Sequence, residues 1–342
     1  MMTGDRAGGD TMDIWRIDET SLKECEARVA DAARHLAAGA LVVVPTETVY
    51  GLAADATNGE AVARIYAAKG RPQFNPLISH VATRAMADAH GAFNEMARTL
   101  AKRFWPGPLT LVVPKRPGST ISDLATAGLD TVALRWPDNP VTCAVIDALG
   151  RPIAAPSANC SGRVSPTTAK AAIDEVGASV AMVIDAGPCR IGLESTIVAC
   201  TGTEPTLLRP GGVPSDEIEA VLGVPLARPS ATGLGDPDKP AAPGMLASHY
   251  APRALVRLDA TSVGPDEALL AYGPALPAGA DAAIAVQNLS ERGDPVEAAA
   301  NLFTYLRDLD GSGAGMIAIA PIPETGLGEA INDRLRRAAA ER

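Results

Sequence analysis

Aromatic residues make up only 4% of the 342 residues, and there are only four histidines. A core for this chain must therefore depend mainly on Val, Leu, Ile and Ala, which a hydrophobic content of 47% supplies. The four histidines, His35, His80, His90 and His249, are too few and too scattered to predict a multi-histidine metal centre, and we expect no metal held by the protein itself.

Paired cysteines and long apolar runs are also absent. The five cysteines are an odd number, widely spaced and without a CxxC pair, which argues against a disulfide framework and against a structural zinc site. No apolar run reaches about 18 residues, so no membrane-spanning helix is expected. Residues 1–14 are polar and Gly-rich without a signal-peptide pattern, and we expect this start to be disordered. Together these features predict a cytoplasmic protein with reduced thiols.

The common signatures of nucleotide and hydrolase sites are missing as well. There is no GxxxxGK[ST] loop, no GxGxxG after a strand, no HExxH and no GxSxG. The net charge of −10 excludes nonspecific coating of nucleic acid. Within residues 61–135, however, ten Lys or Arg face four acids. This basic region fits a small polyanion such as a nucleotide, and the alternative is a solvated basic face.

Hydrophobic periodicity predicts interleaved helices and strands over the first two thirds of the chain. Asn139 before Pro140 is a typical helix start, and Gly150 is a typical end. The alternation predicts an α/β domain with a twisted, mixed, open sheet flanked by helices. The predicted helices span 22–38, 60–68, 94–104, 140–149 and 167–176, and the predicted strands span 41–44, 77–81, 109–113, 131–136, 153–155, 182–185, 196–199 and 206–208.

A second, smaller α/β domain is predicted after a linker. Pro, Gly, Asp and Ser dominate residues 228–243 without periodicity. Strand patterns at 255–258 and 316–319 then flank a helix pattern at 295–307. We therefore expect a main domain over 15–226, a linker or lid over 227–253 and a small domain over 254–342.

The densest polar cluster, PTETVYG at 45–51, follows the Val-rich strand directly. Hydroxyl groups at the carboxyl end of a strand are well placed to bind a small ligand in an open α/β sheet. The alternative is a turn whose Thr side chains bond the backbone. Neighbouring residues of an extended segment point opposite ways, so the pattern leaves open whether Thr46 or Thr48 faces a ligand.

Two further segments carry candidate anion-binding groups. Lys69 and Arg71 stand at a predicted helix end and precede Asn75 in a segment stiffened by two prolines. Two cations and an amide in a rigid loop predict a phosphate-binding site. The alternative is that both cations complement the helix dipole. Small residues in APSAN (155–159) and SGRVSPT (161–167) would let backbone amides approach a ligand, or would form only a loop before a capped helix.

Taken together, these segments resemble the threonylcarbamoyl-AMP synthase family, which includes the YrdC-like domain. The residues after 242, with HYAP at 249–252, resemble the linker of the longer two-domain form, and the tail from about 254 resembles its small Rossmann-like accessory domain. The matching segments are PTETVYGL (45–52), KGRP (69–72), NPLISH (75–80), WPGPLT (105–110), APSAN (155–159), SGRVSPT (161–167), EST (194–196) and LLRPGG (207–212).

The resemblance implies an enzyme that joins L-threonine, bicarbonate or CO2, and ATP into threonylcarbamoyl-AMP and pyrophosphate. ATP would bring Mg2+, and downstream threonylcarbamoyl-transferase proteins would modify tRNA beside the anticodon. Tyr250 would also fold over the site as part of a lid. The implied catalytic residues are Lys69, Arg71, Ser157 and Asn159; the implied ATP-binding residues are Arg71, Asn75, Thr131, Ser157, Ser165, Arg209 and Tyr250; and the implied threonine-binding residues are Thr48, His80, Arg135, Ala155 and Ser195.

Three rival hypotheses fit less of the sequence. A module that binds double-stranded RNA through the basic region conflicts with the acidic total and the scarcity of aromatics. A carbamoyl-transfer maturation factor with the same domain would require zinc-finger cysteine pairs and an acylphosphatase region. A purely structural protein would leave the joint occurrence of the motifs unexplained. The preference for threonine over serine is implied by the resemblance alone.

Overall fold

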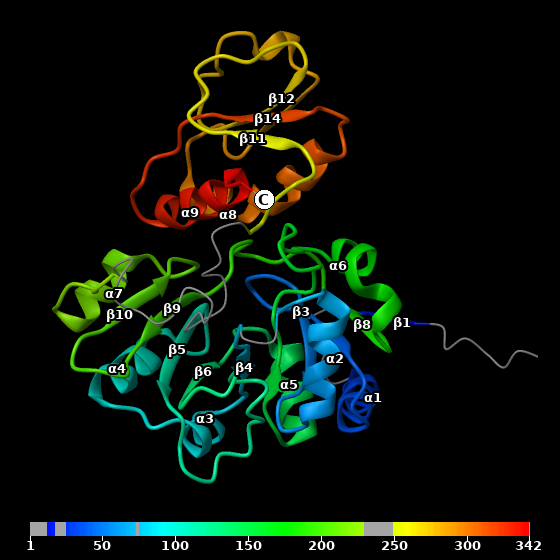
Figure 1. Cartoon of the computed structure of the whole chain (residues 1–342), viewed down its shortest axis with the longest axis vertical. Helices are drawn as coiled ribbons and strands as arrows, with labels where there is room; N and C mark the ends of the chain where they lie inside the picture. The colour runs from blue at the N-terminus through cyan, green and yellow to red at the C-terminus, as the bar shows by residue number, and fades with distance from the viewer. Residues whose placement is uncertain (1–11, 18–24, 73–74, 229–248, 342) are drawn as a thin grey trace, which may run out of the picture.

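The computed structural model describes residues 12–17, 25–72, 75–228 and 249–341, which form a large and a small α/β unit (Figure 1). Ten strands make up the sheet of the large unit, in the order β1-β8-β2-β3-β7-β4-β6-β5-β9-β10. The sheet is mixed, because β4 and β6 run parallel whereas β5 and β6 run antiparallel. The strands are β1 (Asp13–Arg16), β2 (Val42–Val44), β3 (Gly51–Asp55), β4 (Ile78–His80), β5 (Leu109–Pro114), β6 (Thr131–Arg135), β7 (Ile153–Ala154), β8 (Met182–Asp185), β9 (Thr196–Ala199) and β10 (Thr206–Arg209).

Helices cover both faces of this sheet. Val43 of β2 packs into one hydrophobic core, and its neighbours Val42 and Val44 pack into the other, because successive side chains of a strand point to opposite faces. Helices α1 (Glu26–Ala37) and α5 (Pro140–Leu149) line the second core. The first core is lined by α2 (Gly59–Lys69), α4 (Glu95–Phe104), α6 (Ala169–Val176) and α7 (Ser215–Leu222), and the short α3 (Arg84–His90) follows β4.

Local capping fixes the ends of the two helices with the clearest sequence signals. The Asn139 side chain accepts a hydrogen bond from the amide of Thr142 at 3.1 Å, Pro140 is the first residue of α5, and Gly150 ends it with φ of 70°. Gly70 ends α2 in the same left-handed conformation, with φ of 59°. Because Gly70 turns the chain there, Arg71 leaves the helix axis and enters the region where the polar segments gather.

The small unit contains a four-stranded sheet in the order β11-β14-β12-β13, with every pairing parallel. Both of its long helices lie between this sheet and the large unit (Figure 1). Its elements are β11 (Leu255–Arg257), β12 (Glu267–Ala271), β13 (Ala285–Asn288), α8 (Pro295–Asp310), β14 (Met316–Ile319) and α9 (Leu327–Ala339).

The two units pack closely against each other. Val49, Val164 and Leu193 of the large unit belong to the same hydrophobic core as α8 and α9. At Gly192 the backbones almost touch, since a Cβ atom added there would lie 2.5 Å from the Ala299 carbonyl oxygen. The interface therefore has an apolar centre and, at Gly192, a close approach of the two backbones.

The predicted fold class is confirmed: a mixed α/β sheet flanked by helices is followed by a smaller α/β unit with a parallel sheet. The prediction that residues 1–14 are disordered is wrong for Asp13 and Ile14, because β1 pairs with β8 and Trp15 is buried at 6% exposure. Residues 1–11, most of the predicted linker and residues 22–24 of the first predicted helix lie outside the described residues. No helix in the described ranges is long and apolar enough to cross a membrane.

Candidate active site

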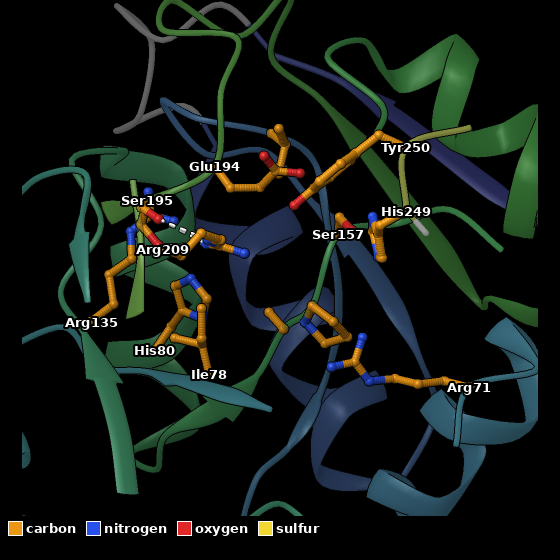
Figure 2. Close-up of a pocket in the computed structure, with 13 residues that line it drawn as sticks. Arg71, Ile78, His80, Arg135, Ser157, Glu194, Ser195, Arg209, His249 and Tyr250 are labelled. Atoms are coloured by element: carbon orange, nitrogen blue, oxygen red, sulfur yellow. Dashed lines mark hydrogen bonds between the residues drawn. The ribbon is translucent and has the colours of Figure 1, made fainter. Parts of the chain in front are cut away.

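The polar segments converge on one pocket between the large sheet and the chain that enters the small unit (Figure 2). Its free space is only about 40 Å³, far less than a nucleotide occupies. His80, Arg135 and Ser195 lie on one side in Figure 2, whereas Arg71, Ser157 and His249 lie on the other. The lining residues are Val49, Arg71, Ile78, His80, Arg135, Ala155, Pro156, Ser157, Glu194, Ser195, Arg209, His249 and Tyr250.

Arg71 lines the pocket, and backbone carbonyls hold its guanidinium in place. Its Nε donates to the Asn75 carbonyl at 3.3 Å and its Nη2 donates to the Pro76 carbonyl at 3.1 Å. The side chain is buried without a carboxylate among these partners, and burial lowers the pKa of Arg71 to about 10. An anionic ligand would supply the charge that this buried cation otherwise lacks.

Lys69 is the last residue of α2, two residues before Arg71. It supports the loop that follows β7 on the side away from the pocket. Its ammonium donates to the carbonyl oxygens of Ser157 and Asn159. Burial, with a smaller contribution from nearby Arg71, lowers the pKa of Lys69 to about 7. Lys69 thus fixes the loop that presents Ser157, although its own side chain does not line the pocket.

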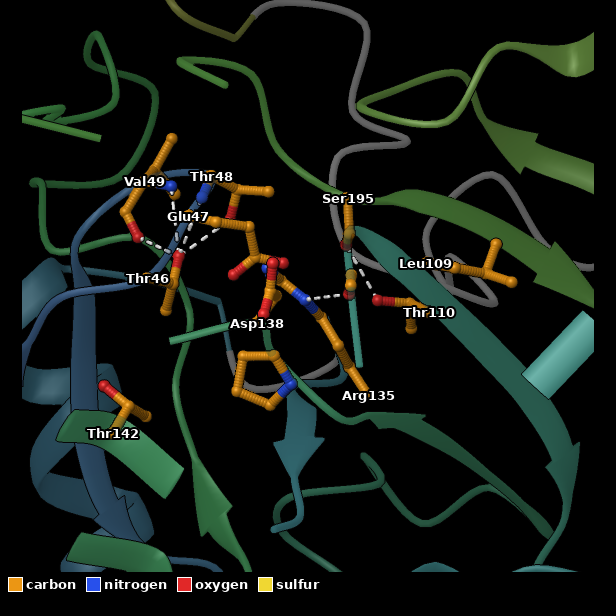
Figure 3. A network of polar contacts seen from close by, with 12 residues as sticks. Thr46, Glu47, Thr48, Val49, Leu109, Thr110, Arg135, Asp138, Thr142 and Ser195 are labelled. Atoms are coloured by element: carbon orange, nitrogen blue, oxygen red, sulfur yellow. Dashed lines mark hydrogen bonds and ion pairs between the residues drawn. The ribbon is translucent and has the colours of Figure 1, made fainter. Parts of the chain in front are cut away.

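On the other side, Arg135 and Glu47 form a buried ion pair (Figure 3). Arg135 Nη2 lies 2.6 Å from Glu47 Oε1, with side-chain exposures of 4% and 1%. Parallel pairing of β4 with β6 places His80 directly beside Arg135. Burial, followed by the charge of Arg135, lowers the pKa of His80 to about 3, so its ring is neutral at physiological pH. A neutral imidazole and an oriented guanidinium therefore form this wall.

The PTETVYG segment forms a hydrogen-bonded turn. The Thr46 hydroxyl donates to the Val49 carbonyl at 2.7 Å and accepts the amide protons of Thr48 and Val49. The hydroxyls of Thr46 and Thr48 are 2.8 Å apart, as Figure 3 shows. Neither threonine lines the pocket, whereas Val49 does. The backbone-bonding alternative thus describes Thr46, whose hydroxyl is occupied within the turn.

The Glu194–Ser195 segment and Arg209 complete the wall of the pocket that contains His80 and Arg135. Arg209 donates through Nη2 to the Ser195 carbonyl at 2.8 Å, and the Ser195 hydroxyl lies 2.7 Å from that of Thr110. Ser165 donates to Glu194 Oε1 at 2.5 Å. Burial by itself would raise the pKa of Glu194, but Arg334 and Arg209 outweigh it and hold this pKa below its ordinary value. Glu194 is therefore an ionised carboxylate in the wall.

His249 and Tyr250 cover the pocket from the side of the small unit. Tyr250 is 1% exposed and has a φ of 61°, which is uncommon for a residue with a side chain. Its ring lies 4.1 Å from that of His249 and stacks on Phe303 of α8 at 5.5 Å, measured between ring centroids. Burial lowers the pKa of His249 to about 3, so this ring is also neutral.

The structure brings most of the predicted site residues together. Thr131 is the exception, since it begins β6 and lies about 13 Å along the strand from Arg135. Eight predicted residues line the pocket: Arg71, His80, Arg135, Ala155, Ser157, Ser195, Arg209 and Tyr250. Five others are buried just outside its lining: Thr48, Lys69, Asn75, Asn159 and Ser165.

Several pocket residues were not assigned a role from the sequence. Glu194 and His249 lie inside the quoted motifs EST and HYAP, so the motifs themselves carried the signal. Glu47 is in PTETVYG, but its pairing with Arg135 joins residues 88 apart and has no local signature. Of the ten cations in the basic region, only Lys69, Arg71 and Arg135 are buried, so a solvated face accounts for most of that charge.

Three arginines, at the ends of β6 and β10 and in the loop after α2, line one buried pocket of a mixed α/β sheet, which suits an enzyme with small anionic substrates. Family models support a specific assignment. Residues 34–211 match the family described as telomere recombination, and residues 213–340 match the C-terminal domain of threonylcarbamoyl-AMP synthase.

Individual relatives match over nearly the whole chain. The threonylcarbamoyl-AMP synthase of Bacillus subtilis is 42% identical, covering 96% of this chain and 98% of its own. That of Schizosaccharomyces pombe is 34% identical, covering 87% and 85%. The crystal structure of Pyrococcus abyssi Sua5 complexed with L-threonine has a TM-score of 0.84 and 38% identity, covering 96% and 97%. The chain belongs to the threonylcarbamoyl-AMP synthase family, in its two-domain form. The predicted enzyme class is thereby confirmed.

Proposed function

We propose that this pocket is where the enzyme joins L-threonine, bicarbonate or CO2, and ATP into threonylcarbamoyl-AMP and pyrophosphate. The observation that carries the proposal is the convergence of Arg71, Arg135 and Arg209, which come from three separate segments of the chain, on one buried space with Ser157. Two of the three substrates are anions and the third is a zwitterion, so a pocket with this charge suits all of them together.

The wall formed by His80, Arg135 and Ser195 is the proposed threonine half. Arg135 would bind the amino-acid carboxylate, because a guanidinium fork matches a carboxylate. The ion pair with Glu47 and the bond to the Gly107 carbonyl would fix its orientation. His80, Ser195, Thr48 and the backbone of Ala155 would contact the rest of the amino acid, and the support comes from their shared wall.

The opposite side is the proposed phosphate half. Arg71 and Ser157 would contact phosphate oxygens directly, and Lys69 and Asn159 would act from immediately behind them. Arg209 and Tyr250 line the space between the halves, with Ser165 and Asn75 behind. Thr131 stays a prediction for the ATP site, and its distance from this pocket does not support it. Mg2+ would enter as part of the ATP substrate, held by phosphates and water.

The reaction needs positioning and charge neutralisation rather than a protein nucleophile. The unprotonated threonine nitrogen adds to CO2 and loses one N–H proton to solvent, which leaves a carbamate anion. A carbamate oxygen then bonds to the α-phosphorus while the bridge to the β-phosphate breaks, and pyrophosphate leaves with both electrons of that bond. Arg71, with Lys69, would offset the charge of two approaching anions in a site of low dielectric. Two neutral histidines add no competing charge.

Exclusion of water is the proposed role of Tyr250. A carbamate is unstable in water, and the covered pocket would protect it until adenylation. Because only about 40 Å³ is free, His249 and Tyr250 must move for ATP to enter. We further propose that the enzyme works in the cytoplasm and that threonylcarbamoyl-transferase proteins use its product on tRNA.

The test is pyrophosphate release by the purified chain with ATP, Mg2+, bicarbonate and each amino acid in turn. Release should require both threonine and bicarbonate, and it should collapse in Lys69→Ala and Arg71→Ala. Lys102→Ala, an exposed cation from the same basic region, is the matched control and should retain activity. Release that ignores threonine, or no release together with tight binding of double-stranded RNA, would refute the proposal.

A further inference from the structure

Arg334 of α9 is a buried cation of the small unit, and its guanidinium contacts the large unit. It is 0% exposed, and its Nε lies 3.0 Å from Glu194 Oε2. Its Nη1 donates to the Pro210 carbonyl at 2.7 Å and to Asp333 at 2.9 Å. Glu194 lines the pocket, and Pro210 directly follows Arg209, which also lines it. Arg334 therefore reaches two wall segments of the active site from outside the large unit.

The same guanidinium lies against the lid. Its central carbon is 5.3 Å from the centroid of the Tyr250 ring, within the range of a cation–π contact. Phe303 of α8 contributes the stacking partner of that ring. Tyr250 has a positive φ, which residues other than glycine rarely adopt, so surrounding contacts must hold its backbone in this conformation. Among the described residues, the two helices of the small unit supply both Phe303 and Arg334.

Charge explains why an arginine stands at this position. Glu194 is buried beside Ser165, and such a carboxylate would be strongly disfavoured without a cation. Arg209 also faces it, but Arg209 is committed to the Ser195 carbonyl. Arg334 bonds Glu194 directly through Nε, and its planar fork binds the Pro210 carbonyl through Nη1 at the same time.

We propose that Arg334 is a positioning residue for the adenylation reaction: through Glu194 and Tyr250 it couples docking of the small unit to closure of the pocket. The small unit then completes the active site rather than only flanking it. This inference rests on the proposed function, since water in an open pocket would take the place of the carbamate at the α-phosphorus and cleave ATP to AMP and pyrophosphate without product. Arg334 itself does not line the pocket and acts only through the two residues that do.

The experiment compares Arg334→Met, Arg334→Lys and Glu194→Gln/Arg334→Met with the unaltered full-length enzyme. The main readout is the number of ATP molecules cleaved per threonylcarbamoyl-AMP formed, which does not depend on the fraction of enzyme that is folded. We expect a ratio near one for the unaltered enzyme and a severalfold higher ratio for Arg334→Met, with Arg334→Lys in between. The double variant should be thermally more stable than Arg334→Met, because no unpaired carboxylate remains. It should still cleave severalfold more ATP per threonylcarbamoyl-AMP than the unaltered enzyme.

Arg307→Met is the matched control for docking. Arg307 of α8 also bridges the units, through Glu175 at 3.1 Å and the Val164 carbonyl, but neither partner lines the pocket. Its loss should lower stability without changing the ratio. Nitration of Tyr250 by tetranitromethane, followed by mass spectrometry, gives a readout independent of activity: it should be severalfold faster in Arg334→Met than in Arg307→Met.

The outcomes separate the two hypotheses. An unchanged ratio and unchanged nitration in Arg334→Met, or equal changes in Arg307→Met, would overturn the inference while leaving the proposed function standing. An unaltered enzyme without threonine-dependent pyrophosphate release would overturn the proposed function and the inference with it.

Discussion

The two units of this enzyme differ most in the charges that they bury. In the described part of the large unit, seven charged side chains are buried: Glu47, Asp55, Lys69, Arg71, Arg135, Glu194 and Arg209. In the described part of the small unit there is one, Arg334. A buried charge is unfavourable unless a partner or ligand compensates it. The described large unit thus buries several charges that need partners or ligands, whereas the described small unit has an apolar core and one buried charge, which contacts the large unit.

This difference indicates which substitutions should lower the free energy of unfolding and which should lower catalytic activity. Glu47 and Arg135 compensate each other within the protein, at 2.6 Å. Among the described residues, Arg71 donates to backbone carbonyls and pairs with no carboxylate. Phe303 and its neighbours in the small unit contribute by packing. The following predictions test these distinctions in order of decreasing effect.

The largest expected effect is on stability, from Glu47→Gln. Removing the carboxylate leaves the Arg135 guanidinium buried without its counter-ion, which should lower the free energy of unfolding by about 3–5 kcal/mol. Denaturant titration measures this. Asp138→Asn breaks an ion pair with Arg190 whose side chains are 51% and 66% exposed, and it should cost at most about 1 kcal/mol. Equal costs for both substitutions would mean that Arg135 does not depend on a buried partner.

The second effect is on activity, from Arg71→Met. The loss of a charge that neutralises phosphate should lower kcat/KM about 10²–10³-fold, or roughly 2.7–4 kcal/mol of transition-state stabilisation. Because Arg71 is buried without a carboxylate partner, the free energy of unfolding should stay the same or rise. A steady-state assay and a denaturant titration on the same preparation separate the two quantities. A large fall in stability would show that folding depends on the Arg71 cation.

A smaller effect is expected for the choice of amino acid. Threonine and serine differ by one methyl group, and an apolar contact of that size discriminates by about 1–3 kcal/mol, or roughly 10–200-fold in kcat/KM. The apolar lining residues Val49 and Ile78 are available for such a contact. Competition between the two amino acids, with both products quantified, measures the ratio. Discrimination well above this range would require a polar contact that rejects serine.

The smallest effect is the uptake of up to one proton when ATP binds. Lys69 has its pKa lowered to about 7 in the free enzyme, so it loses its proton as pH rises through 7. A bound triphosphate favours the ammonium form, so ATP binding should take up close to one proton at pH 8 and little at pH 6, and affinity should weaken as pH rises above 7. Calorimetry in buffers of different ionisation enthalpy measures the uptake.

The control for this prediction is Lys69→Met, in which the uptake should vanish. His80 and His249, each with a pKa of about 3, are neutral across this range and should contribute nothing. Proton uptake that persists without Lys69 would assign it to another group.

Local signals made much of the fold predictable. Helix α5 was predicted with its observed bounds because Asn139, Pro140 and Gly150 mark its ends within one segment. Strand β3 was not predicted, since GLAAD contains no β-branched residue and depends on pairing with β2 and β7. The motif residues of the pocket were predictable because each occurs in a recognisable segment. Arg334 was not, because its contact with Glu194 joins residues 140 apart and its helix resembles any amphipathic surface helix.

Gly192 determines how closely the backbones of the two units can approach each other. With φ of 75° and a Cβ position only 2.5 Å from the Ala299 carbonyl oxygen, the backbones of the two units interlock there without an intervening side chain. An alanine at residue 192 would therefore force the two units slightly apart, because its methyl group would overlap the backbone of Ala299 and Ala300.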